Sequence, residues 1–329
     1  MISDDLRKKL EAINRGPLTA KGTAPEEGTV PGQRGRSPFP AAPHAFEQSA
    51  SLEDVVKGRV IGEPERPCLL VERVLAEIFG MERAEALARE FGSVWSKGRY
   101  ALTDEDRERD WPAIIEAPPT KLLFLDIETC GLASTPVFLI GTMHFEVSSV
   151  GGDPCVPPVL AESKEETRGH TRVAPYKTNG TFHLRQYFAR DYAEERHVLA
   201  HVAEMLPSFD RLVTFNGKSF DWPYIRDRAV YHSVRFADEL ENLDLLHEAR
   251  RRWKTVLPNC QLQTLEFHIS RRRRTGDIPG SLIPEAYHRF VKTGNARQMA
   301  DVVHHNALDL ITMAELMLFI LQGGELVWE

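Results

Sequence analysis

Two carboxylates close an apolar run in the middle of the chain. The segment LLFLDIETCGL, residues 122–132, begins with four large apolar residues and carries Asp126 and Glu128 two positions apart. Such a run is typical of a strand buried on both faces, and residues two apart on a strand point to the same side. Like charges held this close raise at least one pKa unless a cation lies between them. This strand end is therefore either a solvated edge or half of a metal site.

Two later segments also place acids beside predicted strand or helix ends. In LVTFNGKSFDWPYI, Asp221 follows a predicted strand (211–217) and lies in the first turn of a predicted helix. In VVHHNALDLITMAEL, His305 and Asp309 are four positions apart, so a helix places both on one face. That face is otherwise apolar, and metal coordination is one of the few remedies for a buried carboxylate. Carboxylate oxygens of this kind suit Mg²⁺ or Mn²⁺.

Each of these residues also has a simple structural explanation when it is taken alone. Asp309 is explained as a solvated helix residue, and Asp221 as a charge favoured by the helix dipole. Asn216 and Gly217 are typical of a turn, because both residue types tolerate a positive φ. The metal site is favoured only by the three segments together.

The three motifs occur in an order that resembles a known superfamily. Asp-x-Glu, then Asn-Gly-x-x-Phe-Asp, then His-Asn-x-x-Asp are similar to the motifs of the DEDD superfamily of 3′–5′ exonucleases, which has an RNase H-like fold. The similarity is greatest to the bacterial group typified by YprB. The segments LDLLHEARRRWKTVLPNCQLQTLE and DIPGSLIPEAY resemble that group as well. The resemblance covers about residues 118–325 and leaves the first third of the chain untouched.

This resemblance implies a two-metal-ion hydrolysis of phosphodiester bonds, with Mg²⁺ or Mn²⁺ as cofactor. Asp126, Glu128 and Asp309 would bind one ion. Asp126 would bridge to the second ion, which Asp221 would hold directly or through water. His305 would act as general base on the attacking water, since an imidazole can accept a proton at neutral pH. In such a site the two ions stabilise the attacking and leaving oxygens at phosphorus.

The choice of base and the substrate contacts remain open at this point. His305 lies four positions before Asp309 and His304 lies five before it. A helix brings the residue four positions back closer to the Asp side chain, which favours His305. The resemblance also implies that Thr129 contacts the terminal nucleotide through its backbone and that Asn216 helps to position the substrate.

The net charge of −7 argues against a protein that is basic throughout. Between Asp244 and Arg297, however, 11 Lys and Arg face five acids, a balance of +6 that leaves −13 for the remainder. This asymmetry predicts a groove that follows the phosphates of a nucleic acid. The expected substrate is a single-stranded or frayed 3′ end, and the expected products are nucleoside 5′-monophosphates. Two alternatives are an endonuclease of the same fold and a non-catalytic nucleic-acid-binding module.

The order of predicted elements indicates an α/β fold. We expect an RNase H-like mixed sheet flanked by helices over residues 118–329, with an exposed insertion at 148–180 and a long helix at about 296–320. Residues 1–117 are expected to be a partly disordered N-terminal extension, rich in linker sequence, with a helical segment near 70–91.

The cysteines and the apolar runs bear on the compartment. The four cysteines are far apart and form no CxxC pair, which predicts neither a zinc site nor a dense disulfide framework. The N-terminal residues contain no apolar core of signal-peptide length, and no window approaches the ~18 apolar residues of a membrane span. We therefore expect a cytoplasmic protein without a membrane segment.

Overall fold

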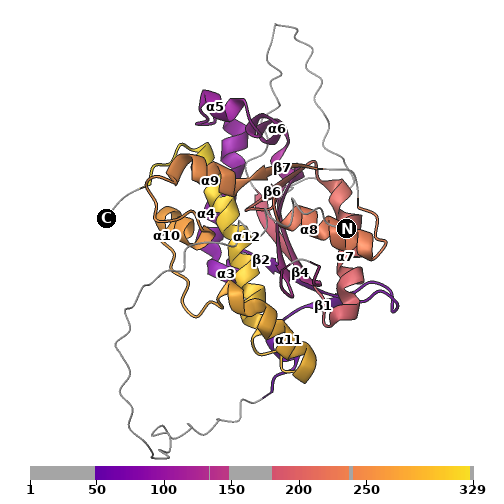
Figure 1. Ribbon diagram of the computed structural model, residues 1–329. Coiled ribbons are helices and arrows are strands. Elements are labelled where there is room, and N and C mark those ends of the chain that lie inside the picture. Colours follow the sequence, from indigo (N-terminus) through magenta and orange to yellow (C-terminus); the bar gives the residue numbers. More distant parts are fainter. Residues whose placement is uncertain (1–48, 133, 148–179, 237–239, 327–329) are drawn as a thin grey trace, which may run out of the picture. The chain divides into compact units, whose positions relative to one another are not determined.

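The computed structural model describes residues 49–132, 134–147, 180–236 and 240–326 (Figure 1). The linker-rich start of the predicted N-terminal extension and almost all of the predicted insertion at 148–180 lie outside the described residues. The described residues form one compact unit.

The centre of this unit is a seven-stranded mixed sheet. Its strand order is β1-β2-β5-β4-β3-β6-β7. The strands are β1 (Arg59–Ile61), β2 (Cys68–Val74), β3 (Leu122–Thr129), β4 (Val137–Val147), β5 (Gly180–Phe188), β6 (Arg211–Thr214) and β7 (Glu241–Asp244). The pairs β3–β6 and β6–β7 are parallel, and all other neighbouring pairs are antiparallel. The predicted mixed sheet is confirmed.

The helices of the described part vary in length from one turn to 23 residues. They are α2 (Leu52–Val55), α3 (Ala76–Phe79), α4 (Met81–Lys97), α5 (Asp104–Arg107), α6 (Trp111–Glu116), α7 (Glu195–Met205), α8 (Asp221–Tyr231), α9 (Leu245–Trp253), α10 (Leu262–Ser270), α11 (Ile283–Thr293) and α12 (Met299–Leu321). Short 3₁₀ helices are η1 (Pro119–Lys121), η2 (Tyr192–Glu194), η3 (Leu206–Ser208) and η4 (Gly280–Leu282). α12 is the long helix that the sequence predicts at about 296–320.

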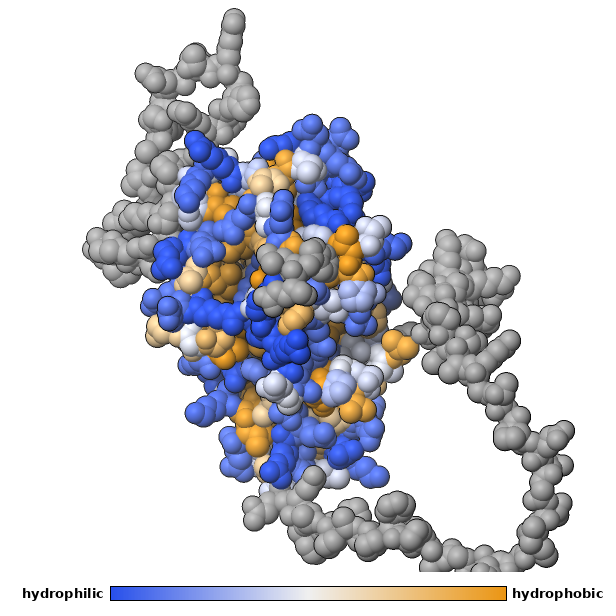
Figure 2. Space-filling view, turned by 90° about the vertical axis from the view of Figure 1, so that its left-hand side faces the viewer, coloured by the Kyte–Doolittle hydropathy of each residue, from blue (hydrophilic) through white to orange (hydrophobic). Residues whose placement is uncertain are grey.

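These helices cover both faces of the sheet. Leu123 and Leu125 of β3 lie in the core on the side of α7, α8 and α11, whereas Leu122 and Phe124 lie in the core on the side of α4, α9 and α10. All four side chains are fully buried, which confirms a strand buried on both faces. α12 packs into both cores, because its first turn belongs to one and its later turns to the other. On the outside, Figure 2 shows mainly hydrophilic residues with separate apolar patches on one face.

The structure corrects the prediction for residues 70–91. Residues 68–74 form β2, which pairs with residues 183–188 of β5. The helical part of the prediction is found only after this strand, in the one-turn helix α3 and in α4. The apolar run CLLV lies between β1 and β5, and its partner in β5 lies more than 100 positions away, so that pairing leaves no local signal. Residues 49–117 also pack with the sheet, and Trp111 donates a 2.6 Å hydrogen bond to Glu248 of α9. Residue 118 is therefore not a structural boundary.

The remaining expectations concern membrane segments and cysteines. None of the helices there is long and apolar enough to cross a bilayer. Cys68, Cys130 and Cys260 are free thiols, and all three are buried.

Candidate active site

The C-terminal end of β3 brings the first two acids close to Asp221, the first residue of α8. Asp126 and Glu128 both lie half-buried there, on the side of the sheet that Phe124 also faces. Asp221 is the first residue of α8, and its Oδ1 accepts a hydrogen bond from the Ile127 N–H at 3.2 Å. The backbone between the two β3 acids therefore holds the third one in place.

The Asn-Gly turn before α8 fixes the direction of that helix. Asn216 has a φ of +67°, as the turn requires, and its carbonyl accepts the N–H groups that begin the turn into the helix. The buried Asp244 accepts the N–H groups of Asn216 (2.8 Å) and Lys218 (3.1 Å). A Cβ at Gly217 would lie 2.3 Å from the Thr214 side chain, so only glycine fits. Asp244 thus has a structural function, because it holds the turn that contains Asn216 and leads to Asp221.

Asn306, within the His-Asn-x-x-Asp motif, connects α12 directly to β3. Its fully buried Nδ2 donates to Asp126 Oδ2 at 2.7 Å, and its Oδ1 accepts from Gln186 Nε2 at 2.7 Å. A Cβ at Gly141 of β4 would lie 2.0 Å from Asn306 Oδ1, so the helix can approach the sheet only over a glycine. Sequence analysis did not assign Asn306 a function, although a buried amide between His305 and an apolar stretch was visible in the motif.

The four predicted ligands lie close enough to perturb one another. Burial raises the pKa of Asp126 well above its ordinary value, and the charges of Asp309, Asp221 and Glu128 raise it further. Burial likewise raises the pKa of Glu128, with Asp309 and Asp221 adding to the effect. The pKa of Asp221 rises to about 7, mainly through burial. The structure therefore brings together the acids of β3, α8 and α12 that the sequence placed far apart.

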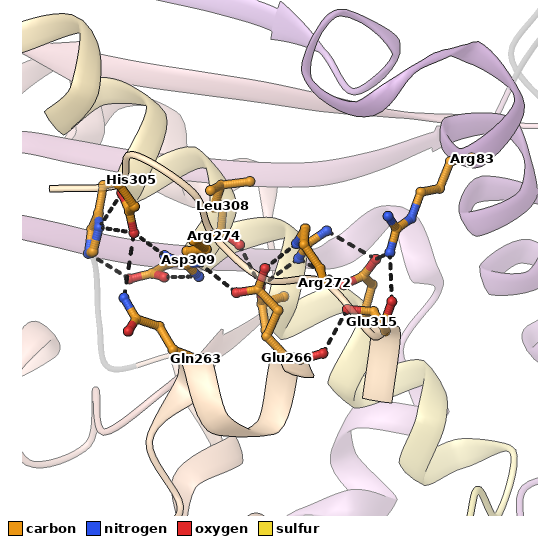
Figure 3. Close-up of polar contacts among 12 residues, drawn as sticks. Arg83, Gln263, Glu266, Arg272, Arg274, His305, Leu308, Asp309 and Glu315 are labelled. Carbon is orange, nitrogen blue, oxygen red and sulfur yellow. Dashed lines mark hydrogen bonds and ion pairs between the residues drawn. The ribbon is translucent and has the colours of Figure 1, made fainter. Parts of the chain in front are cut away.

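A loop between α10 and η4 adds two charged residues that sequence analysis did not assign to the site. Arg274 Nη2 donates to Asp309 Oδ1 at 2.6 Å, and its Nε donates to Glu266 Oε2 at 2.6 Å (Figure 3). Burial raises the pKa of Asp309, whereas the Arg274 guanidinium opposes that rise. The second residue is Asp277, whose Oδ2 lies 3.3 Å from Arg274 Nη1. The sequence RRRRTGDIPG does not show which of its charged side chains contact residues of α12.

The two adjacent histidines have different surroundings. His305 is buried, with Nδ1 at 2.9 and 3.0 Å from the Asp277 carboxylate oxygens and Nε2 at 3.6 Å from Asp309 Oδ2. His304 is partly exposed, and its pKa is lowered by burial and then by the charge of Arg73. Of the two, His305 faces the acids.

The donor set fits a divalent ion in its chemistry. Four carboxylates supply hard oxygens, and their mutual repulsion is the charge that a dication would neutralise. Among the described side chains, no group of three or more His, Cys, Asp or Glu stands arranged to hold a metal ion. Arg274 donates to Asp309 Oδ1, so a dication bound through this oxygen would compete with Arg274.

Four arginines of the basic stretch between Asp244 and Arg297 are held by buried acids and so do not belong to the predicted phosphate groove. Arg251 and Arg252 both pair with the buried acids Asp106 and Glu248. The Arg272 and Arg274 side chains are likewise held by acids in the interior. These guanidiniums neutralise buried carboxylates between elements, a use of charge that a sequence count cannot separate from a binding surface.

Comparison with known proteins is consistent with this geometry. Residues 163–320 match the model of the RNase H superfamily. This region is similar in sequence to the RNase H superfamily. The match includes Asp221, His305 and Asp309 and begins after β4, so that the two acids of β3 lie before it.

Two curated relatives are similar to parts of this chain. Over 150 residues the chain is 33% identical to the uncharacterized protein YprB of Bacillus subtilis, which covers 45% of this chain and 35% of that protein. Over 171 residues it is 26% identical to DNA polymerase 1 of Aeropyrum pernix, covering 48% and 17% of the two chains. The resemblance to the YprB group is confirmed. The matches span only about a third and a sixth of these relatives.

Proposed function

We propose that this chain is a metal-dependent nuclease that removes nucleotides from the 3′ end of a nucleic acid by a two-metal-ion mechanism. The observation that carries the proposal is the gathering of four acids from β3, α8 and α12, whose charges raise one another's pKa. The match to the RNase H superfamily and the similarity to a DNA polymerase support nuclease activity. The substrate we propose is a single-stranded or frayed 3′ end, and the compartment is the cytoplasm.

The proposed ligands of Mg²⁺ or Mn²⁺ are the four acids. Asp126, Glu128 and Asp309 would hold one ion, and Asp126 and Asp221 would hold the other. When bound, the ions would stabilise the charge on the attacking and leaving oxygens. The chain itself orients these ligands, because Asn306 fixes Asp126 and the Ile127 N–H fixes Asp221.

His305 is the proposed general base. Its Nδ1 faces Asp277 and its Nε2 is directed toward Asp309, so Nε2 is the atom that would take the proton of the attacking water. Thr129 and Asn216 are proposed to contact the terminal nucleotide. The Thr129 hydroxyl donates to the Gly131 carbonyl at 2.8 Å, and the proposed substrate contact is through its backbone.

The test is a degradation assay on DNA and RNA strands labelled at the 5′ end, each with a free or a blocked 3′ end. We expect a ladder that shortens from the 3′ end, requires Mg²⁺ or Mn²⁺ and disappears when the 3′ end is blocked. Asp126→Ala should abolish the ladder. Glu285→Gln should leave it unchanged, because this exposed acid of α11 lies in no part of the site. Cleavage of the blocked strand would identify an endonuclease, and no metal-dependent cleavage would refute the proposal.

A further inference from the structure

Asp277 and His305 form a buried pair from two separate segments of the chain. Both carboxylate oxygens of Asp277 lie within 3.0 Å of His305 Nδ1, and the two side chains are 8% and 9% exposed. The pair joins the loop before η4 to the second turn of α12. The proposed function gives His305 the part of general base but gives Asp277 none.

The chemistry of this contact determines where the imidazole carries its proton. An ionised carboxylate only accepts hydrogen bonds, so Nδ1 must donate to Asp277. A neutral ring that is protonated at Nδ1 has its lone pair at Nε2. Nε2 is the nitrogen on the side of Asp309, 3.6 Å from Oδ2. We infer that Asp277 is a positioning residue that holds His305 in the Nδ1–H tautomer with Nε2 toward the four acids.

The surroundings of Asp277 hold its carboxylate in place. Oδ2 also accepts from Arg274 Nη1 at 3.3 Å and from Gln263 Nε2 at 3.5 Å. Arg274 is itself anchored on Glu266, which a second arginine, Arg272, also holds. The dashed contacts in Figure 3 continue from there to α12 and to α4.

An ion pair also connects α4, in the N-terminal part of the chain, to α12. Arg272 Nη2 lies 3.0 Å from Glu315 of α12, and Arg83 of α4 lies 3.5 Å from the same acid. Ion pairs to α12 therefore hold the loop that carries Arg272, Arg274 and Asp277. Because the Asp277 carboxylate is held in place, it can impose one ring orientation on His305.

The inference rests on the proposed function only in taking His305 as the base, because the tautomer can be measured without any substrate. The direct test is a long-range ¹H–¹⁵N spectrum of the metal-free protein with ¹⁵N-labelled histidine, at a pH where the imidazoles are neutral. The His305 signals are identified by their loss in His305→Gln. We expect the Nδ1–H pattern in the wild type. The Nε2–H pattern there would overturn the inference without any variant.

The matched variants separate the hydrogen bond from its surroundings. Asp277→Ala removes the acceptor, and the His305 ring should change to the Nε2–H tautomer, which Asp309 can then accept. Gln263→Ala removes another contact of Asp277 from the exposed side and should leave the tautomer unchanged. An Asp277→Ala protein that is folded and keeps the Nδ1–H pattern would contradict the inference.

Kinetics then tests whether the tautomer matters to the reaction. In Asp277→Ala we expect kcat to fall ~10²–10⁴-fold, the usual contribution of a positioned base, with KM and dication affinity nearly unchanged. A lower dication affinity instead would make Asp277 part of the metal site and overturn the positioning function. If the wild type cleaves nothing, the proposed function fails, whereas the spectrum still decides how Asp277 orients His305.

Discussion

Asp221 offers the sharpest test of the crowded acids, because Asn can replace it without loss of its structural contact. Burial, with help from Asp244 and Asp309, raises the pKa of Asp221 from 3.8 to about 7. In Asp221→Asn the side-chain oxygen can still accept the Ile127 N–H, while the charge is gone. The variant therefore isolates the cost of ionising this side chain in the metal-free fold.

The size and sign of the effect follow from the pKa. One pKa unit corresponds to about 1.4 kcal/mol, so the ionised Asp221 costs the metal-free protein roughly 2–4 kcal/mol. Well below pH 4 the group is protonated in both the folded and the unfolded chain, and the cost is absent. Between there and about pH 7 the unfolded chain ionises first, so the stability of the wild type falls while that of the variant does not.

The assay is urea unfolding with a chelator at a series of pH values. The free energy of unfolding of Asp221→Asn minus that of the wild type should increase by roughly 2–4 kcal/mol between pH ~4.5 and pH ~8. Asp227→Asn, an exposed acid on the same helix, should show no such gain. Excess Mg²⁺ should stabilise the wild type at pH 8, by about 2.7 kcal/mol at 100 times its Kd, and the variant less. A difference between wild type and Asp221→Asn that stays constant with pH would refute the reasoning.

Two further changes probe the contacts around the acids. Arg274→Met should destabilise the metal-free protein by about 3–5 kcal/mol, because it removes the guanidinium that pairs with Asp309 and one of the two that pair with Glu266. Mg²⁺ should recover part of this loss by neutralising Asp309, and a loss below 1 kcal/mol in urea unfolding would contradict the account. Gly141→Ala places a Cβ 2.0 Å from Asn306 Oδ1 and should cost about 1–3 kcal/mol and weaken dication binding measured by calorimetry. Gly280→Ala, whose Cβ meets nothing within 4 Å, should change neither quantity.

The sequence predicted the part of the fold that is encoded locally. The apolar run of β3 is continuous, α8 begins directly at Asp221, and α12 has a long apolar pattern, so these elements and their acids were found from spacing alone. Their grouping in space came from the order of three motifs rather than from any single one.

What sequence analysis missed depends on contacts between distant segments. β2 looked helical because its longer pairing is with β5, which lies more than 100 positions away, whereas its local pairing with β1 covers only three residues. Arg274 and Asp277 counted as members of a charged run, although one binds Asp309 and the other His305. A count of charges cannot show that a guanidinium is buried against acids, since pairing depends on how the loop after α10 returns to α12.

The central claim is that acids from three elements share divalent ions. The most direct measurement is anomalous scattering from crystals of the protein grown or soaked with Mn²⁺. We predict Mn²⁺ peaks within coordination distance of Asp126, Glu128 and Asp309, with Arg274 moved away from Asp309. Ordered crystals in saturating Mn²⁺ that show no peak at these carboxylates, and Arg274 still on Asp309, would contradict the claim.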